Sequence, residues 1–183
     1  SRYTFIVLIV LNLGNDVQAF DKQHSENFPQ DLTVLLDCDN FSKVGSATFS
    51  VLFWDIYESK LLTSSGEYPI ESEFESLIFD IKYLADISSD ELIERTIEQW
   101  QHLGINESNY EAYIPELNSL WPDIKKGDRL SLLIRDKQSV FYFNGEYVGI
   151  IESPVFGQLF IDIWLSEQTS QPKLRQKLLG RNR

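Results

Sequence analysis

The order in which apolar patterns change along the chain constrains its fold most. Alternating strand patterns come first, then two helical patterns, then three short strands, then two more helices, over residues 46–62, 77–84, 88–104, 108–120, 128–151, 153–164 and 172–180. Asn144-Gly145, between two alternating runs, is typical of a two-residue hairpin turn. This order predicts an α+β protein in which a large antiparallel sheet carries helices on one face.

The most apolar strand pattern, from Ser46 to Leu62, predicts one long strand or a bent pair of strands. Both faces are apolar in its middle, since Phe49 and Phe53 alternate with Trp54 and Ile56. Such two-sided patterns are typical of strands that are covered on both faces. We therefore expect this segment at the centre of the sheet.

The first residues have the pattern of a secretory signal peptide. Arg2 precedes an apolar run from Phe5 to Leu13, and Val17 and Ala19 are the small residues expected before a cleavage site. The run is shorter than the about 20 residues of a membrane-spanning helix. The alternative is a buried core segment. We expect an exported protein, periplasmic if the source is a Gram-negative bacterium.

The chain then divides into four parts. We predict a signal peptide over residues 1–19, a loose N-terminal lead-in over 20–31, one folded domain over 32–180 and a basic tail over 181–183. Cys38 is the single cysteine, so no internal disulfide can form. The domain must rely on its apolar core for stability.

The charge of the chain restricts its partners. The formal net charge is −12, and it stays −12 without residues 1–19 because that segment has one Arg and one Asp. Such a surface repels phosphate backbones, so we expect no nucleic-acid binding. The C-terminal segment is the exception, with Lys173, Arg175, Lys177, Arg181 and Arg183. It could contact anionic lipid or an acidic partner, or simply be a solvated helix end whose cations complement the helix dipole.

Motifs for metal and nucleotide chemistry are missing from the sequence. His24 and His102 have no partner at metal-ligand spacing. No glycine-rich phosphate loop follows a strand, and no Gly-x-Ser-x-Gly motif occurs. We predict neither a metal nor a cofactor.

A few polar side chains interrupt apolar strands and are the candidate site residues. Asp55 and Tyr57 follow Trp54 in the most apolar segment, and Tyr83 and Arg135 each end an alternating strand. Either Asp55 or Tyr57 could act as an acid–base group, whereas Trp54, Tyr57, Tyr83 and Arg135 are candidate ligand-binding residues. The simpler alternatives are a solvated Asp55 at a strand end and a surface ion pair for Arg135.

Several short motifs follow one another in a characteristic order. They are Val44-Gly45, residues 53–61, Ile81-Lys82-Tyr83-Leu84, Gln99-Trp100, residues 121–128, Phe143-Asn144-Gly145, Gly149, Ile163-Trp164-Leu165, residues 172–175 and Leu178-Leu179-Gly180. Together they resemble the chalcone isomerase-like family, in particular its exported bacterial branch. The resemblance implies an open-faced β-sandwich, that is, a large antiparallel sheet with helices layered on it.

The resemblance implies one of two activities. Plant members close a chalcone into a flavanone and use an arginine on an early strand, whereas other members bind fatty acids in the same cleft without catalysis. This sequence has no arginine between Arg2 and Arg95, and Lys43 occupies the region where the strand arginine is expected. Lysine lacks the planar fork of arginine, so flavonoid cyclisation is not expected.

Three functions follow. The first is an exported, non-catalytic protein that binds a fatty acid or similar apolar molecule between sheet and helices, with Tyr57, Tyr83 or Arg135 at its polar end. The second is an isomerase or intramolecular lyase that transfers a proton on an unsaturated substrate through Asp55 or Tyr57. The third is an accessory subunit of a lipid-modifying system, docked through the basic C-terminal helix.

Overall fold

The structure is a computed structural model that describes residues 28–38 and 41–181. The predicted signal peptide, most of the predicted lead-in and Arg183 lie outside these residues. Within them, no helix is both long and apolar enough to cross a membrane.

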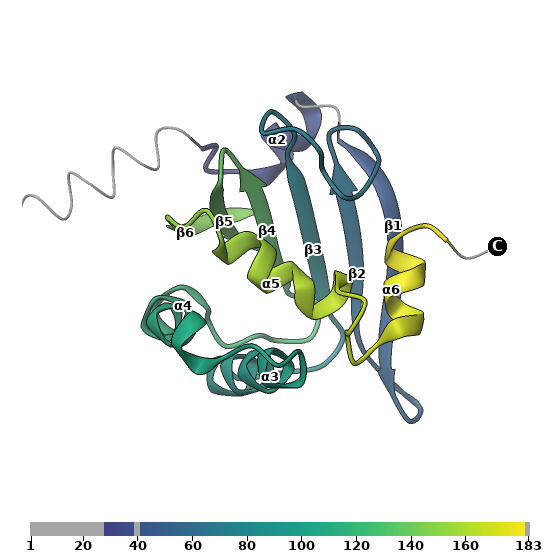
Figure 1. The fold of residues 1–183 in the computed structure, drawn as a ribbon, viewed down its shortest axis with the longest axis vertical. Helices are drawn as coiled ribbons and strands as arrows, with labels where there is room; N and C mark the ends of the chain where they lie inside the picture. Colours follow the sequence, from purple (N-terminus) through teal and green to yellow (C-terminus); the bar gives the residue numbers. More distant parts are fainter. Residues whose placement is uncertain (1–27, 39–40, 182–183) are drawn as a thin grey trace, which may run out of the picture.

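Six strands form one antiparallel sheet in which every strand pairs with its neighbours in sequence (Figure 1). They are β1 (Ser42–Val51), β2 (Trp54–Thr63), β3 (Leu77–Tyr83), β4 (Arg129–Arg135), β5 (Gln138–Phe143) and β6 (Glu146–Ile151). The β5–β6 turn is Asn144-Gly145, with φ of 50° and 86°, as its sequence predicts.

Four helices contribute side chains to the core on one face of the sheet. They are α3 (Ser89–His102), α4 (Ile114–Leu120), α5 (Phe156–Leu165) and α6 (Pro172–Leu178). Helix α3 begins at a capping box, in which the Ser88 side chain accepts from the Glu91 N–H and the Glu91 carboxylate accepts from the Ser88 N–H. Two short 3₁₀ turns, Glu107–Asn109 and Glu111–Tyr113, precede α4, where one longer helix was predicted. The predicted α+β architecture is confirmed.

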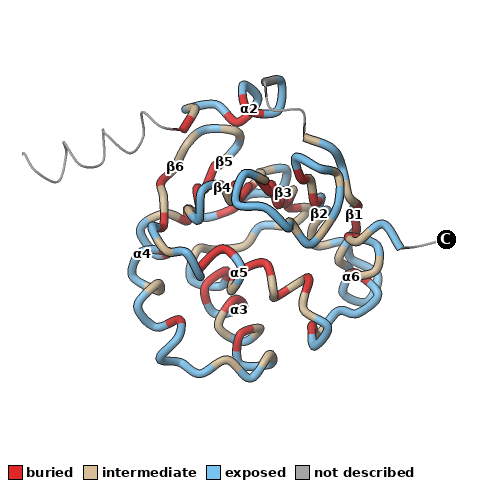
Figure 2. The backbone as a smooth tube through the Cα atoms, turned by 45° about the horizontal axis from the view of Figure 1, so that its top comes forward, coloured by how far each residue is buried: buried red, intermediate tan, exposed pale blue. Residues whose placement is uncertain are grey.

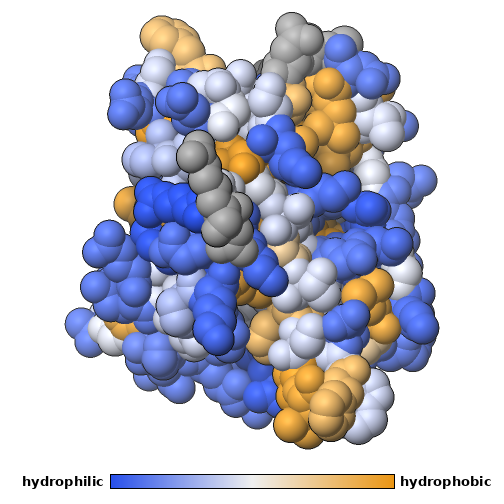
Figure 3. All heavy atoms as spheres, turned by 90° about the vertical axis from the view of Figure 1, so that its right-hand side faces the viewer, coloured by the Kyte–Doolittle hydropathy of each residue, from blue (hydrophilic) through white to orange (hydrophobic). Residues whose placement is uncertain are grey.

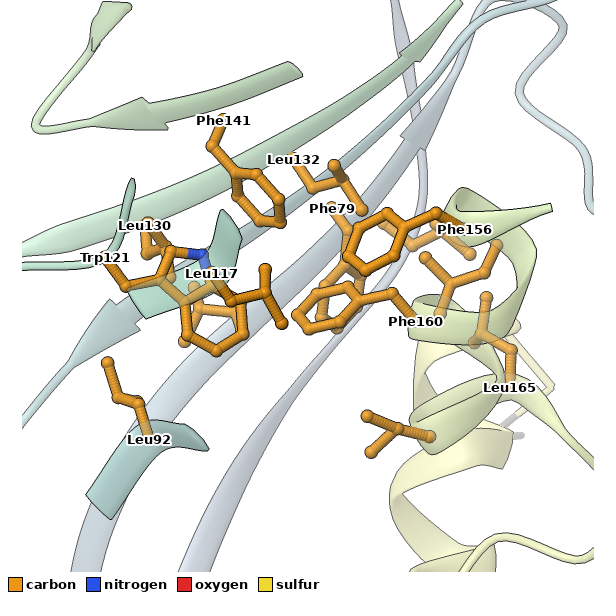
Figure 4. Close-up of a cluster of buried hydrophobic side chains, with 14 of the residues drawn as sticks. Phe79, Leu92, Leu117, Trp121, Leu130, Leu132, Phe141, Phe156, Phe160 and Leu165 are labelled. Atoms are coloured by element: carbon orange, nitrogen blue, oxygen red, sulfur yellow. The ribbon is translucent and has the colours of Figure 1, made fainter. Parts of the chain in front are cut away.

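The core lies mainly between the sheet and these helices (Figure 2). Aromatic rings fill its middle, where Trp121, Phe141, Phe156 and Phe160 meet edge to face or stack. Figure 4 shows that the rings come from the sheet, from α5 and from the segment after α4.

A second, smaller core covers the opposite face of the sheet. Helix α2 (Leu32–Cys38) and Phe28 pack there against Ile78, Leu133 and Val140. Phe28 falls in the predicted loose lead-in and is buried, and Asp31 forms a bridge with Glu146 of β6. The described end of that segment is therefore part of the packed fold.

Of the two alternatives for residues 46–62, the pair of strands is confirmed, whereas the covered position at the centre of the sheet is wrong for β1 and for the turn. The segment is the β1–β2 hairpin, β1 is an edge strand, and Val51 pairs with Trp54 across a two-residue turn. A register shift after Phe49 interrupts the alternation, so the apolar side chains near the turn do not continue the core face. They lie exposed at the end of the hairpin.

The last helix covers the first strand. A Cβ atom on Gly45 of β1 would lie 2.2 Å from the Lys177 carbonyl oxygen and 2.4 Å from that of Leu178. Only glycine allows α6 to approach the strand this closely. Leu174 and Leu178 are buried by this contact.

Candidate functional site

A cavity of about 590 Å³ lies between one end of the sheet and helices α3 and α5. The sheet contributes Phe49, Val51, Ile56, Tyr57, Tyr83 and Leu130. The opposite wall includes Leu92 and Thr96 of α3, Trp121, and Phe160, Ile163 and Trp164 of α5. In Figure 4, Leu92 and Trp121 lie on one side and Phe160 on the other. The size and the apolar wall are typical of small-molecule sites.

The charged groups of the lining lie at its rim. They are Asp86, Glu91, Arg95 and Glu98, and all four are exposed. Arg95 donates to the Glu98 carboxylate at 2.8 Å, one turn further along α3. An amphiphile whose apolar part enters the cavity would thus have its polar end near charged side chains and water.

Two tyrosines from neighbouring strands lie side by side in the wall. Tyr57 and Tyr83 are register partners of β2 and β3, and their ring centroids are 6.0 Å apart. The Tyr57 hydroxyl accepts a hydrogen bond from Trp164 Nε1 at 2.9 Å, and its ring stacks on Phe49 at 5.2 Å. The strand register and α5 together fix the Tyr57 side chain.

Both phenols are neutral at ordinary pH. Burial raises the pKa of Tyr57 to about 12, although the Trp164 hydrogen bond opposes this. Burial also raises the pKa of Tyr83, and the neighbouring Tyr57 adds to the effect. A general base works best with a pKa near the working pH, so neither tyrosine is suited to remove a proton.

The predicted site residues do not all meet at this cavity. Tyr57 and Tyr83 line it, whereas Trp54 and Asp55 lie beyond it at the end of the β1–β2 hairpin. Asp55 is exposed and accepts a hydrogen bond from the Ser50 hydroxyl at 2.6 Å. No acid–base pair therefore forms between Asp55 and Tyr57.

Arg135 lies at the other end of the sheet. It borders a separate cavity of about 170 Å³ between the β2–β3 loop and the start of α5. Its Nε donates to the Ser76 hydroxyl at 3.0 Å. The sequence placed it correctly at a strand end, but the direction of β4 takes it away from Tyr57 and Tyr83.

Sequence reasoning missed the contribution of α3 to the rim. Glu91, Arg95 and Glu98 recur at helical spacing beside the buried Leu92 and Thr96, and this spacing is the signal that could have found them. Among the described lining residues, Arg95 is the only basic side chain. It comes from a helix rather than from the early strand that the family resemblance implies, and Lys43 on β1 is exposed and outside the lining.

The basic C-terminal helix is partly used by the fold. Arg175 donates through Nε to the Leu165 carbonyl at 2.8 Å and lies 3.9 Å from the Glu167 carboxylate. Lys173, Lys177 and Arg181 are exposed.

In the described part of the chain, no group of three or more His, Cys, Asp or Glu side chains is placed to hold a metal ion.

Two known proteins are similar to this chain, one in sequence and one in fold. An uncharacterised protein of Haemophilus influenzae is 24% identical over 144 residues, which cover 79% of this chain and 70% of that protein. A crystal structure of an Arabidopsis thaliana fatty-acid binding protein has a TM-score of 0.61 at 12% identity, covering 83% of this chain and 90% of that one. At this identity the structural likeness concerns the fold alone.

The family assignment comes from the sequence profile of the chalcone isomerase-like proteins. It matches residues 29–180, from three residues before α2 to Gly180 after α6. The match includes all six strands and every residue of the cavity lining. The chain therefore belongs to the chalcone isomerase-like family.

Proposed function

We propose that the protein binds a fatty acid or a similar long apolar molecule in the 590 Å³ cavity without transforming it. One observation carries this proposal: the lining is apolar or neutral on the sheet side and along α5, and its charged groups are confined to the exposed rim. That distribution suits an amphiphile, because its tail leaves water while its polar end stays hydrated. The fatty-acid binding protein that shares this fold supports the same ligand class.

The chemistry of the wall supports binding over catalysis. Proton transfer needs a group whose pKa lies near the working pH, and the pKa values of Tyr57 and Tyr83 are raised away from it. Asp55, the other candidate, is exposed outside the cavity. The neutral phenols are suited to donate a hydrogen bond to a ligand or simply to pack against it.

Arg95 is our candidate for the polar end of an acidic ligand. A carboxylate at the rim would compete with Glu98 for the guanidinium, which can hold a carboxylate through two parallel hydrogen bonds. Because Arg95 is exposed, the contribution is small, about 2- to 5-fold in affinity. A carboxylate therefore adds some affinity, whereas most comes from burial of the chain.

The test is to identify what the purified protein carries. We expect mass spectrometry of an organic extract to find a long-chain compound in stoichiometric amount, and displacement titrations to show binding of long-chain fatty acids. Arg95→Gln should weaken the binding of a fatty acid but not the binding of the alcohol of equal length. The matched control is Arg135→Gln, at the distant end of the sheet. Protein that is empty from a lipid-rich host and fails to bind any long-chain compound would refute the proposal.

We also propose that the protein works outside the cytoplasm after removal of residues 1–19. The support is the sequence pattern alone: a basic residue, a short apolar run and small residues before the cleavage site. Expression of the full-length precursor in a Gram-negative host should give a periplasmic protein whose N-terminal residue is Phe20. An intact N-terminus in the cytoplasmic fraction would contradict the proposal.

A further inference from the structure

The turn of the β1–β2 hairpin exposes four consecutive apolar side chains. We call Val51, Leu52, Phe53 and Trp54 the hairpin tip. Leu52 is 81% exposed, Phe53 95% and Trp54 67%. Single exposed apolar residues are common, but a contiguous group marks an interaction site.

The hairpin tip extends beyond the rest of the sheet. Pairing between β2 and β3 begins at Tyr57 and Tyr83, and a last hydrogen bond joins the Leu84 N–H to the Ile56 carbonyl at 2.8 Å. Beyond that point β1 and β2 pair only with each other in the described sheet. Figure 1 shows the hairpin projecting at the lower right, and Figure 3 shows apolar side chains gathered at the same end.

The turn is built from residues that local structure does not favour. Leu52 has φ of 56°, a region in which Gly, Asn and Asp are preferred. The β5–β6 turn of this same chain meets the requirement with Asn144-Gly145. Neither turn geometry nor solubility accounts for Leu-Phe at the tip, so these side chains point to a function in contact with another surface.

The geometry favours a lipid bilayer as that surface. A stable protein interface involves about 20 to 30 residues a side, far more than the four of the hairpin tip. A few apolar side chains are enough, however, for weak and reversible insertion into the boundary between headgroups and acyl chains. Trp54, at the base of the turn, is of a residue type that is enriched at this boundary.

The hairpin tip is also continuous with the cavity. Val51 belongs to both, and Phe49, two residues earlier on β1, lines the cavity as well. The tip carries no basic cluster, and Asp55 adds a negative charge beside it. Attraction to anionic lipid would therefore not drive this contact, which distinguishes it from docking through α6.

We propose that the hairpin tip inserts into a lipid bilayer and places the mouth of the cavity at the membrane surface. Membrane contact does not depend on the proposed ligand, whereas its use for loading and release of that ligand rests on the proposed function. A water-insoluble molecule would then pass between bilayer and cavity without crossing bulk water.

The test is sedimentation with vesicles of phosphatidylcholine, a zwitterionic lipid without net charge. The chain from Phe20 is used because the apolar run at residues 5–13 would itself bind lipid. Both described core clusters lie entirely between Phe28 and Leu179, so this form keeps the folded unit. The Leu52→Ser/Phe53→Ser variant should lose about 100-fold in partitioning, since two apolar side chains no longer leave water. The matched control is Phe74→Ser, also 95% exposed but in the β2–β3 loop at the opposite end of the sheet, which should retain wild-type partitioning.

Three outcomes would overturn the proposal. One is wild-type protein that does not bind the phosphatidylcholine vesicles. Another is binding that requires anionic lipid and is lost in about 1 M salt, where screening acts within about 3 Å, because it would assign the contact to α6. The last is a wild-type dimer that the double variant makes monomeric, because the hairpin tip would then be a contact between copies of the chain.

A second readout locates the contact within the molecule. Brominated acyl chains should quench Trp54, and Trp54→Phe should abolish that quenching while it keeps most of the binding. The affinity for a fatty acid added in solution should be unchanged in the double variant, because neither Leu52 nor Phe53 lines the cavity. Loss of vesicle binding and loss of ligand are thus separate results.

Discussion

Replacing Thr96 with phenylalanine tests directly whether the cavity is the ligand site. Thr96 is buried on α3, lines the cavity, and its hydroxyl donates to the Leu92 carbonyl at 2.7 Å. That hydroxyl is dispensable, because the helix supplies the same carbonyl with a main-chain donor. Threonine and phenylalanine also have similar helix propensities, so the substitution changes mainly the space that is left open.

The magnitude follows from the 590 Å³ of open space beside Thr96. A phenyl ring that moves from water into this space stabilises the fold by about 1.5 to 3 kcal/mol, reduced by the loss of side-chain freedom. We expect the free energy of unfolding of Thr96→Phe, measured without ligand, to equal that of the wild type or exceed it by about 1 kcal/mol. Were the region already filled, the same ring would cost about 1 to 3 kcal/mol through overpacking.

The assay combines thermal unfolding with ligand titration. For a domain of this size, about 1 kcal/mol shifts Tm by about 2 to 4 °C, so the two cases differ measurably. We expect fatty-acid binding to fall at least about 10-fold, while Glu94→Phe, on the exposed side of α3, keeps it. A Thr96→Phe protein that is destabilised by more than about 2 kcal/mol and still binds ligand would refute the reasoning.

Three further results are expected. Tyr57→Phe should lower the free energy of unfolding in urea by about 1 to 3 kcal/mol, because Trp164 Nε1 loses its acceptor. A double-mutant cycle with Trp164→Phe should show coupling between the two residues rather than additivity. The pKa of Tyr57 is raised from 10.0 to about 12, so its contribution to stability is intact below pH 10 and is lost as the pH rises towards 12. The free energy of unfolding should therefore fall over this pH range in the wild type and fall less steeply in Tyr57→Phe. Equal slopes in the two proteins would contradict the assignment. Gly45→Ala should lower the free energy of unfolding by about 2 kcal/mol or more, because the new Cβ displaces α6 and uncovers Leu178. A loss below about 0.5 kcal/mol would show that α6 adjusts freely.

Elements that carry their own local signals could be predicted from the sequence. The start of α3 is set by hydrogen bonds between Ser88 and Glu91, and the β5–β6 turn by the tolerance of Asn144 and Gly145 for positive φ. Both depend on residues within one turn of each other. Alternation is a local signal too: Phe79 of β3 and Leu132 of β4 face the larger core, and their neighbours Ile78 and Leu133 face the smaller one.

The β1–β2 hairpin shows where such signals end. No Gly, Asn or Pro marks its turn, and the apolar Leu52 and Phe53 read as the middle of a buried strand. An apolar sequence pattern predicts burial, but Leu52 and Phe53 are apolar and exposed. The sequence pattern therefore did not reveal the turn, because Leu52 and Phe53 are not turn-favouring residues.

The site depends on contacts that no local pattern encodes. Tyr57 and Tyr83 meet because of strand register, and Trp164 joins them from 107 positions further along the chain. Arg135 was placed correctly at a strand end, but the antiparallel direction of β4 puts that end far from the tyrosines. Which strand ends meet is decided by the topology of the whole sheet.

The contact between α6 and β1 has a consequence for biosynthesis. Gly45 is made early and receives its cover from the carbonyls of Lys177 and Leu178, about 130 residues later. Until α6 has been synthesised, β1 therefore lacks the helix that covers it at Gly45. The six strands can pair in the order of their synthesis, but the cover of β1 is complete only after α6 has left the ribosome.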